Sequence, residues 1–154
     1  KEGLPEPAHI FLSGRGAPHR DSIDGDIHLL PKDEFLAKLE EYGGTPKEVL
    51  ENKELMDLFI PILRSDFKVC NEYIYTPVEE PFDFGITVFT GLKEDLDEED
   101  IEEWQEYTKE QLNSHRFPGG HFFLHQSTNR NYIIRIISKR IFQLIEESRE
   151  KQAG

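Results

Sequence analysis

Apolar residues form short dense runs at three places along the chain, separated by segments with helical spacing. The run over 8–13, AHIFLS, is closed by Gly14 and predicts a strand buried on both faces, as in a parallel sheet. The run over 84–90, FGITVFT, is rich in β-branched and aromatic residues and predicts a second strand, which ends at Gly91. A weaker run over 111–117 completes a predicted set of three strands.

Between the first two runs the apolar spacing changes to threes and fours, which predicts helices. One helix is expected over 31–42, and Thr45-Pro46-Lys47-Glu48 predicts a capping box with proline at the first position of a short second helix. Asn52 is expected to cap a third helix, in which Pro61 predicts a kink or a break near Leu58. The inward stripe of this third helix is expected to comprise Leu55, Leu58, Phe59, Ile62, Leu63, Phe67 and Cys70.

Two more helices are expected after the second and third strands, over 98–108 and 131–147. One side of the first is expected to carry Ile101, Trp104, Gln105 and Thr108. The inward face of the second is expected to carry Ile133, Ile134, Ile137, Ile141, Leu144 and Ile145. Strands that alternate with helices in this way are typical of βαβ units, so the order predicts an α/β fold with a parallel sheet.

An all-helical block interrupts that alternation. In an α/β sheet such an insertion usually lies above the carboxyl ends of the strands, where ligands bind. We therefore expect an α/β core over 1–25 and 76–154 and a helical lid insertion over 26–75, with an ordinary packing subdomain as the alternative reading of that insertion.

Composition narrows the classes of function. The chain has 154 residues, which fits one domain or a large piece of one, and its net charge of -13 argues against nucleic acid as a partner. The single cysteine, Cys70, excludes an internal disulfide and fits a reducing, cytoplasmic compartment. No apolar run approaches the roughly 20 residues that span a bilayer. We expect no membrane partner, no metal and no other cofactor.

The first residues, Lys1–Pro7, read as the end of a helix followed by a loop. We therefore expect the chain to begin inside a larger fold, although a tag remnant or proteolysis gives the same start.

Two loops that follow predicted strands carry the candidate chemistry. Gly91-Leu92-Lys93-Glu94-Asp95 follows the second strand, and Gly119-Gly120-His121 follows the third. An acid after one strand and a histidine after the next match the second part of a Ser…Asp/Glu…His triad in chain order. In such a triad the acid accepts the Nδ1 proton of the histidine, which transfers the proton of a serine. A turn histidine without chemistry and an acid in the first turn of the next helix are the alternative readings.

The chain resembles the C-terminal two-thirds of the type II thioesterases of polyketide and nonribosomal peptide synthesis, which are α/β-hydrolases. The matching stretches are IFLSGRGAPH (10–19), LPKDEFL (30–36), YGGTPKEVLENKELMDLFIPILRSDF (42–67), ITVFTGLKE (86–94) and FPGGHFFL (117–124). The resemblance implies a partial α/β-hydrolase fold, with parallel strands, flanking helices and an inserted helical lid. It also implies release of acyl groups from the phosphopantetheine arm of acyl or peptidyl carrier proteins.

Two catalytic residues follow from the resemblance. His121 matches the catalytic histidine, and Glu94 stands where the family usually has the aspartate of a G-x-x-D pattern. A longer carboxylate can still orient a histidine. Asp95 and Asp97 are close enough to take the role of the acid instead.

The nucleophile of the family does not match. Its serine lies in G-x-S-x-G, and this chain contains no such motif. Ser13 is excluded because the strained elbow needs a small residue two positions before the serine, where this chain has Phe11. We therefore expect this chain to supply acid, base and lid, while an upstream segment supplies the serine and the oxyanion hole. The sheet would then lack its central strands and leave 8–13 and 84–90 with an uncovered edge.

Two other functions remain open. The chain could be a non-catalytic module that binds carrier proteins, for which the only basic cluster comprises Arg15, His19, Arg20, Lys32 and Lys38. It could also belong to an α/β-hydrolase of different activity, such as an esterase or acyltransferase.

Overall fold

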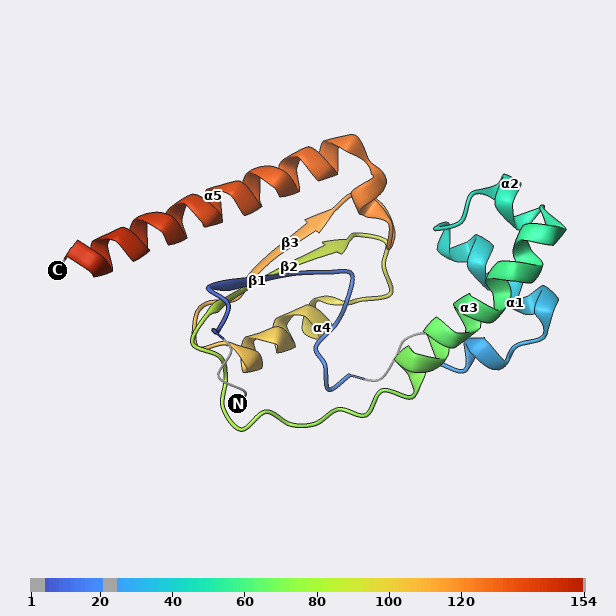
Figure 1. Ribbon diagram of the computed structural model, residues 1–154, viewed down its shortest axis with the longest axis horizontal. Helices are drawn as coiled ribbons and strands as arrows, with labels where there is room; N and C mark the ends of the chain where they lie inside the picture. Colours follow the sequence, from blue (N-terminus) through green and yellow to red (C-terminus); the bar gives the residue numbers. More distant parts are fainter. Residues whose placement is uncertain (1–4, 21–24, 154) are drawn as a thin grey trace. The chain divides into compact units, whose positions relative to one another are not determined.

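The computed structural model describes residues 5–20 and 25–153 and divides the chain into two compact units (Figure 1). The α/β unit comprises Lys1–Gly16 and Val78–Gly154, and the helical unit comprises Ala17–Pro77. Residues 1–4, on which the predicted helix end falls, lie outside the described residues.

The three predicted strands are confirmed as β1 (His9–Ser13), β2 (Gly85–Gly91) and β3 (Asn113–Phe117). They form one parallel sheet in the order β1-β2-β3. β2 is buried along its whole length because it has a hydrogen-bonded neighbour on each side. The prediction of an uncovered edge at 84–90 is therefore wrong, since β1 and β3 are the outer strands of the sheet in the described part of the chain.

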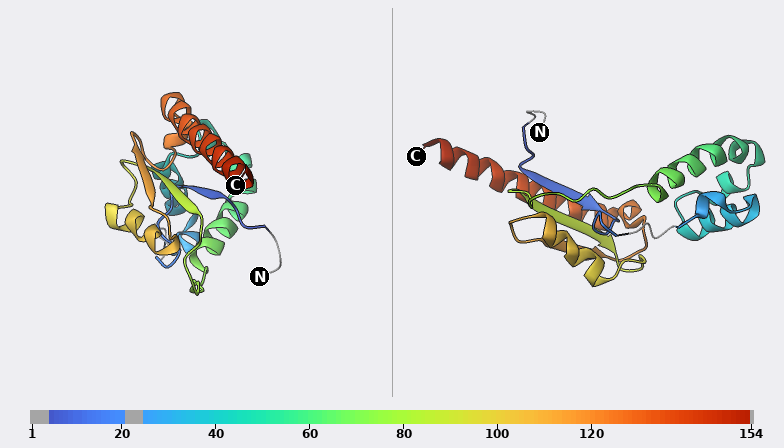
Figure 2. Two further views of the ribbon diagram at one scale, coloured as in Figure 1. Left: turned by 90° about the vertical axis from the view of Figure 1, so that its left-hand side faces the viewer. Right: turned by 90° about the horizontal axis from the view of Figure 1, so that it is seen from below.

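Helices cover the two faces of this sheet (Figure 2). On one face lies α5 (Ser127–Ala153), with a buried core of Phe89, Phe117, Phe123 and Ile133. On the other face lies α4 (Glu98–Glu102), which continues as the 3₁₀-helix η2 (Glu103–Tyr107). Because side chains alternate along a strand, β2 contributes side chains to the packing on both faces of the sheet. The predicted order of strands and helices is confirmed.

The expected helix over 98–108 differs in its inward face. Because the chain tightens from α4 into η2, Tyr107 is buried at 4% exposure, whereas Gln105 is exposed. The Gln105 amide instead donates to the carbonyls of Thr108 and Glu110 and accepts from Leu112 N–H, so it ties the following loop to η2.

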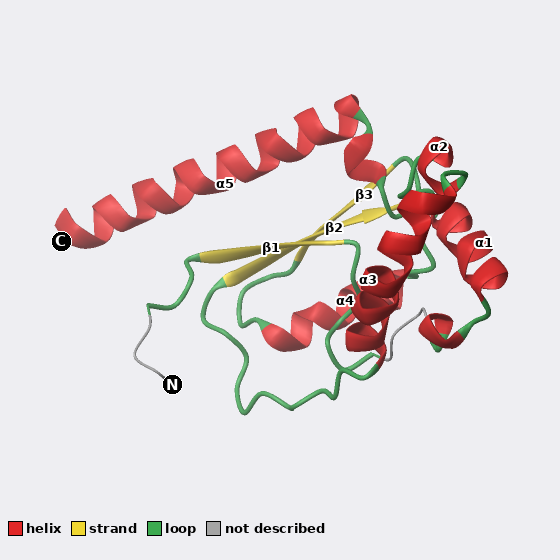
Figure 3. Ribbon diagram, turned by 45° about the vertical axis from the view of Figure 1, so that its right-hand side comes forward, coloured by secondary structure: helices red, strands yellow, loops and turns green. Residues whose placement is uncertain are grey.

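The inward face expected for α5 is confirmed at three of its six positions, one of which is the partly buried Leu144. Ile133 is buried and Ile137 is partly buried, but Ile134, Ile141 and Ile145 are exposed by 53%, 47% and 43%. The C-terminal half of α5 extends beyond the strands and has no sheet beneath it (Figures 1 and 3). The end of the sheet accounts for the exposure of Ile141 and Ile145, whereas Ile134 lies on the outer side of the helix beside the buried Ile133.

The helical unit comprises the 3₁₀-helix η1 (Ile27–Leu29), α1 (Lys32–Tyr42), α2 (Lys47–Leu50) and α3 (Lys53–Asn71). Its own core consists of Ile27, Phe35, Leu39, Met56 and Ile60. The third helix is capped as predicted, because the Asn52 side chain accepts from Leu55 N–H at 3.1 Å. The capping box at Thr45 is wrong: Pro46 itself occupies the cap position of α2, and no side chain caps this helix.

The expectations for α3 are confirmed only in part. The helix runs without a break through Pro61, and a kink near Leu58 stays a prediction. The buried residues are Met56 and Ile60, with Leu63 and Phe67 packed against them, so both sides of the proline pack on one core. Leu63 and Phe67 therefore face inward as expected, but Leu58 and Ile62 are 70% and 56% exposed. Leu55 and Phe59 are exposed as well, and so is Cys70.

Candidate active site

The loops after β2 and β3 are joined by backbone hydrogen bonds at the carboxyl edge of the sheet. Leu92 N–H donates to Phe117 O at 2.8 Å, and Lys93 N–H donates to Gly119 O at 2.9 Å. At Gly91 a Cβ would lie 2.7 Å from Gly119 O and still closer to Gly120 O. A glycine at the end of β2 therefore lets the two loops approach within backbone contact.

Glu94 is buried between these loops. Its side chain is 4% exposed, and its Oε1 lies 2.8 Å from Nδ1 of His121. The other oxygen, Oε2, accepts from Gly91 N–H at 2.5 Å. Because a carboxylate oxygen accepts hydrogen bonds, this contact suits a His121 ring that carries a proton on Nδ1. Both carboxylate oxygens are thus held, and the acid has one fixed orientation.

His121 follows a sharp turn in the loop after β3. Gly119 has a φ of 118°, a backbone conformation that disfavours any side chain, whereas a Cβ at Gly120 would meet open space. The ring of His121 is 55% exposed and packs edge-on against Phe122, with ring centroids 5.1 Å apart. The histidine is therefore fixed at Nδ1 by Glu94 while most of its ring is accessible.

The His121 loop is also held from α5 by Asn129, a residue that the sequence did not single out. Its amide donates to Pro118 O at 2.8 Å and to Phe123 O at 2.9 Å, on either side of the histidine. Asn129 is 4% exposed, and Phe123, which anchors the loop in the core, is 1% exposed. The available signal was the position of Asn129 four residues before the buried Ile133, on the same side of the helix, but its contacts could not be read from the pattern.

The other candidate acids lie differently. Asp97 caps α4, because its side chain accepts from Asp100 N–H at 2.9 Å. In return, the Asp100 side chain accepts from Asp97 N–H. Asp95 is exposed. Glu94 precedes this cap, so it is not part of the first turn of the helix. Of the three acids, Glu94 is the one that the structure brings to His121.

The end of β1 reaches the same place. Gly14 N–H donates to Phe89 O at 2.9 Å, and a Cβ at Gly14 would lie 2.9 Å from Cε1 of His121. Ser13, which precedes it, is exposed. The carboxyl ends of all three strands therefore surround the Glu94–His121 pair.

The basic cluster expected for a carrier-binding module is divided between the two units. Arg15 belongs to the α/β unit, and the other four residues belong to the helical unit. Lys32 pairs with Asp57 and Lys38 pairs with Glu41 within the helical unit.

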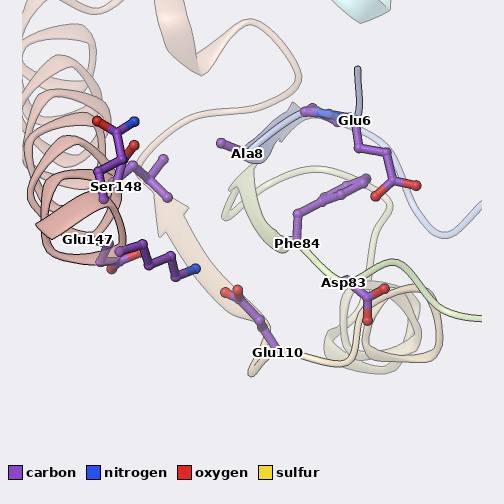
Figure 4. A pocket seen from close by; sticks show the side chains of 11 residues that line it. Glu6, Ala8, Asp83, Phe84, Glu110, Glu147 and Ser148 are labelled. Atoms are coloured by element: carbon purple, nitrogen blue, oxygen red, sulfur yellow. The ribbon is translucent and has the colours of Figure 1, made fainter. Parts of the chain in front are cut away.

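An open pocket of about 410 Å³ lies at the amino ends of the strands, opposite the carboxyl ends that hold Glu94 and His121 (Figure 4). The pocket is lined by one residue from just before each strand, Ala8, Phe84 and Glu110. Glu147 and Ser148 of α5 line it as well. Each strand therefore separates this pocket from the Glu94–His121 pair by its own length, about 15 Å or more.

The described residues contain no group of three or more His, Cys, Asp or Glu side chains that could hold a metal ion. Among the same residues, no helix is long and apolar enough to cross a membrane.

A parallel sheet flanked by helices, with an acid after β2 that holds a histidine after β3, defines a part of the α/β-hydrolase fold. The family model for the thioesterase domain matches residues 1–141, and the chain therefore belongs to this family.

Individual relatives agree with this assignment. The gramicidin S biosynthesis protein GrsT of Aneurinibacillus migulanus is 41% identical over 122 residues, which cover 79% of this chain and 47% of GrsT. The crystal structure of ClbQ from the colibactin NRPS/PKS pathway has a TM-score of 0.81 at 28% identity and covers 92% of this chain and 59% of ClbQ. The type II thioesterase BorB from the borrelidin biosynthetic cluster has a TM-score of 0.72 at 29% identity, with 86% of this chain and 53% of BorB covered.

The resemblance to type II thioesterases is thus confirmed. The chain spans about half the length of the curated relatives that it matches.

Proposed function

We propose that this chain supplies the acid and the base of a serine thioesterase that releases acyl groups from phosphopantetheine-loaded carrier proteins. Glu94 is the acid, His121 is the base, and a segment upstream of this chain supplies the serine and the oxyanion hole. The observation that carries the proposal is the 2.8 Å contact between His121 Nδ1 and a buried carboxylate whose second oxygen is already bound.

The proposed chemistry uses the two ring nitrogens of His121 in different ways. Donation from Nδ1 to Glu94 leaves Nε2 as the nitrogen that accepts a proton. Nε2 takes the serine proton as the serine oxygen attacks the thioester carbonyl, and the tetrahedral intermediate then expels the pantetheine sulfur, which receives that proton. Water deprotonated by the same nitrogen hydrolyses the acyl-serine and releases the free acid, with the proton returned to the serine oxygen.

The carrier-protein substrate is supported by the family and by the pathways named for its relatives. GrsT is a gramicidin S biosynthesis protein, and ClbQ comes from an NRPS/PKS pathway. In our proposal, residues 26–75 of the helical unit form a lid over the acyl chain. A cytoplasmic location remains a prediction that rests on the single cysteine.

The test measures thiol release from an acyl-loaded carrier protein, both by this chain alone and by the longer protein that carries the serine upstream. We expect the longer protein to turn over and the 154-residue chain alone to stay at background. Cys70, which is exposed, adds a constant signal of its own to any thiol assay and is subtracted. A parallel assay with p-nitrophenyl esters separates a thioesterase from a general esterase.

In the longer protein, His121→Ala is expected to lower kcat by about 10⁴–10⁶-fold, because a triad acts as a unit. His125→Ala is the matched control, since His125 is an exposed histidine in the same loop region, and its kcat should stay within about 2-fold. Strong turnover by the 154-residue chain alone, abolished by His121→Ala, would show that no upstream serine is needed.

A further inference from the structure

The end of β1 and the loop that follows it carry the sequence Leu12-Ser13-Gly14-Arg15-Gly16, to which the proposed chemistry assigns no role. In the structure Gly14 of this loop faces both the acid and the histidine. Gly14 has a φ of 65°, and a Cβ built there would lie 2.9 Å from Cε1 and 3.2 Å from Nδ1 of His121. The same Cβ would lie 3.1 Å from Oε1 of Glu94. A side chain at this position would therefore collide with the His121 ring and crowd the Glu94 carboxylate.

The loop itself cannot withdraw from this contact without loss of hydrogen bonds. Gly14 N–H donates to Phe89 O at 2.9 Å, which continues the pairing of β1 with β2. The carbonyl of the next residue, Arg15, accepts from the indole N–H of Trp104 at 3.1 Å. Trp104 is 9% exposed, so this anchor lies in the core between the sheet and η2. The backbone at Gly14 is thus fixed on both sides.

Of the two groups that Gly14 faces, His121 is the one with room to move. The Glu94 side chain is 4% exposed and is bound through its second oxygen to Gly91 N–H, whereas the His121 side chain is 55% exposed. A Cβ at position 14 would therefore displace the imidazole rather than the carboxylate. Displacement lengthens the contact from Nδ1 to Oε1, which is 2.8 Å in this structure.

We infer that Gly14 is a positioning residue: its bare backbone forms the wall that holds the His121 ring against Glu94 and so keeps the proton on Nδ1. The catalytic meaning of this inference rests on the proposed function, but the inference itself concerns only the geometry and the tautomer of the ring. It gives the Leu12–Gly16 motif a role that does not require Ser13 as a nucleophile.

The test is ¹⁵N NMR of the histidine rings in the 154-residue chain at about pH 8, where an ordinary imidazole is neutral. In a neutral ring the protonated and the unprotonated nitrogen resonate far apart, so the spectrum identifies the tautomer of His121. We expect the Nδ1–H tautomer in the unaltered protein. In Gly14→Ala we expect the Nδ1–H signal to be lost or strongly reduced, in favour of the Nε2–H tautomer common in exposed histidines.

Gly43→Ala is the matched control. Gly43 has a φ of 68°, nearly that of Gly14, but no atom lies within 4 Å of a Cβ built there. Both substitutions therefore impose the same left-handed backbone on an alanine, and only Gly14→Ala adds the collision. Gly14→Asn is the second variant, because asparagine tolerates a left-handed φ and still carries the Cβ.

The inference is supported if Gly14→Ala or Gly14→Asn is folded, as judged by circular dichroism, and changes the tautomer while Gly43→Ala does not. It is wrong if a folded Gly14 variant keeps the Nδ1–H signal, or if Gly43→Ala changes the signal equally. It is also wrong if both Gly14 variants lose the fold, since the glycine would then serve the fold as a whole. Absence of the Nδ1–H tautomer in the unaltered protein would instead contradict the Glu94–His121 pair of the proposed function.

Discussion

Glu94 is one methylene longer than the aspartate usual at this position in the family, and the structure shows where the extra length goes. The side chain folds back so that Oε2 accepts from Gly91 N–H while Oε1 contacts His121. The acid is therefore clamped to the end of β2 before it meets the histidine. This explains how a longer and more flexible carboxylate can still hold the ring in one orientation.

The choice of acid can be tested by two isosteric changes next to each other in sequence. Glu94→Gln is expected to lower kcat of the serine-bearing protein by about 10⁴-fold, because an amide can offer the histidine the wrong hydrogen-bonding partner and cannot stabilise the imidazolium. Asp95→Asn, at an exposed position, should leave kcat within about 2-fold. A larger loss in Asp95→Asn than in Glu94→Gln, measured by thiol release, would move the role of the acid to Asp95.

The glycines of the two loops differ in importance. At Gly91 a Cβ would overlap the carbonyls of Gly119 and Gly120, whereas at Gly120 it would meet nothing within 4 Å. Gly91→Ala is therefore expected to lower the free energy of unfolding by more than about 1 kcal/mol, and Gly120→Ala to change it by less than about 0.5 kcal/mol. Urea unfolding of each variant gives both values, and equal losses would contradict the close approach of the loops.

At the scale of elements, the sequence predicted strands better than helix faces. The strand runs are short and mostly apolar, so an error of one residue in a predicted bound still places the strand correctly. All three predicted strands were found. α3 and α5 carry apolar residues around much of their circumference, so a spacing of three and four fits more than one face. On α3 the buried Met56 and Ile60 each follow a predicted position by one residue, although Leu63, nearer the C-terminus, packs on the core as predicted. Which face packs is decided by neighbours that a local pattern does not contain.

The residues of the candidate site also differ in whether the sequence could predict them. Glu94 and His121 could be found from the sequence because their order relative to strands is local information. Gly14 and Asn129 could not, because their roles come from contacts across elements: Gly14 with the His121 ring and Asn129 with Pro118 O. A glycine after a strand and an asparagine in a helix are common, and only the fold shows what they touch.

Asn129 offers a test of how α5 supports the His121 loop. Asn129→Ala would leave the carbonyls of Pro118 and Phe123 without their donor, which costs about 1–3 kcal/mol of unfolding free energy for each buried group. Asn131→Ala, at an exposed position of the same helix, makes the same chemical change without that loss and should be neutral or slightly stabilising. Thermal or urea unfolding distinguishes them, and equal stability of the two variants would show that the amide is not needed.

At the scale of the whole molecule, acidification changes stability through two opposing effects, one from the net charge of -13 and one from the partly buried His9. Acidification protonates carboxylates and relieves the repulsion among them, which favours the compact state. His9 opposes this trend, because burial and the Arg140 guanidinium, partly offset by Glu110, lower the pKa of its imidazole below 6.5. Its Nε2 contacts Thr87 Oγ1 at 2.9 Å, and Arg140 Nε donates to its Nδ1 at 3.3 Å, so the neutral ring fits the site.

The sign of the His9 effect follows from this depressed pKa. In the unfolded chain His9 takes up a proton near its ordinary pKa of about 6.5, whereas in the folded protein it does so only at lower pH. Stability from His9 is therefore fully present above about pH 6.5 and is lost as the pH falls from there through the folded pKa.

Urea unfolding of the protein and of His9→Gln at pH 7.5 and at pH 5.5 isolates this contribution, since the carboxylates are common to both. We expect the unaltered protein to lose more unfolding free energy, or gain less, than His9→Gln over this interval. His115→Gln is the comparison variant, because burial also lowers the pKa of His115 but no arginine acts on it, so its difference should have the same sign. Identical pH dependence of the unaltered protein and His9→Gln would show that the imidazole is hydrated in the folded state and that the contacts with Thr87 and Arg140 do not hold it neutral.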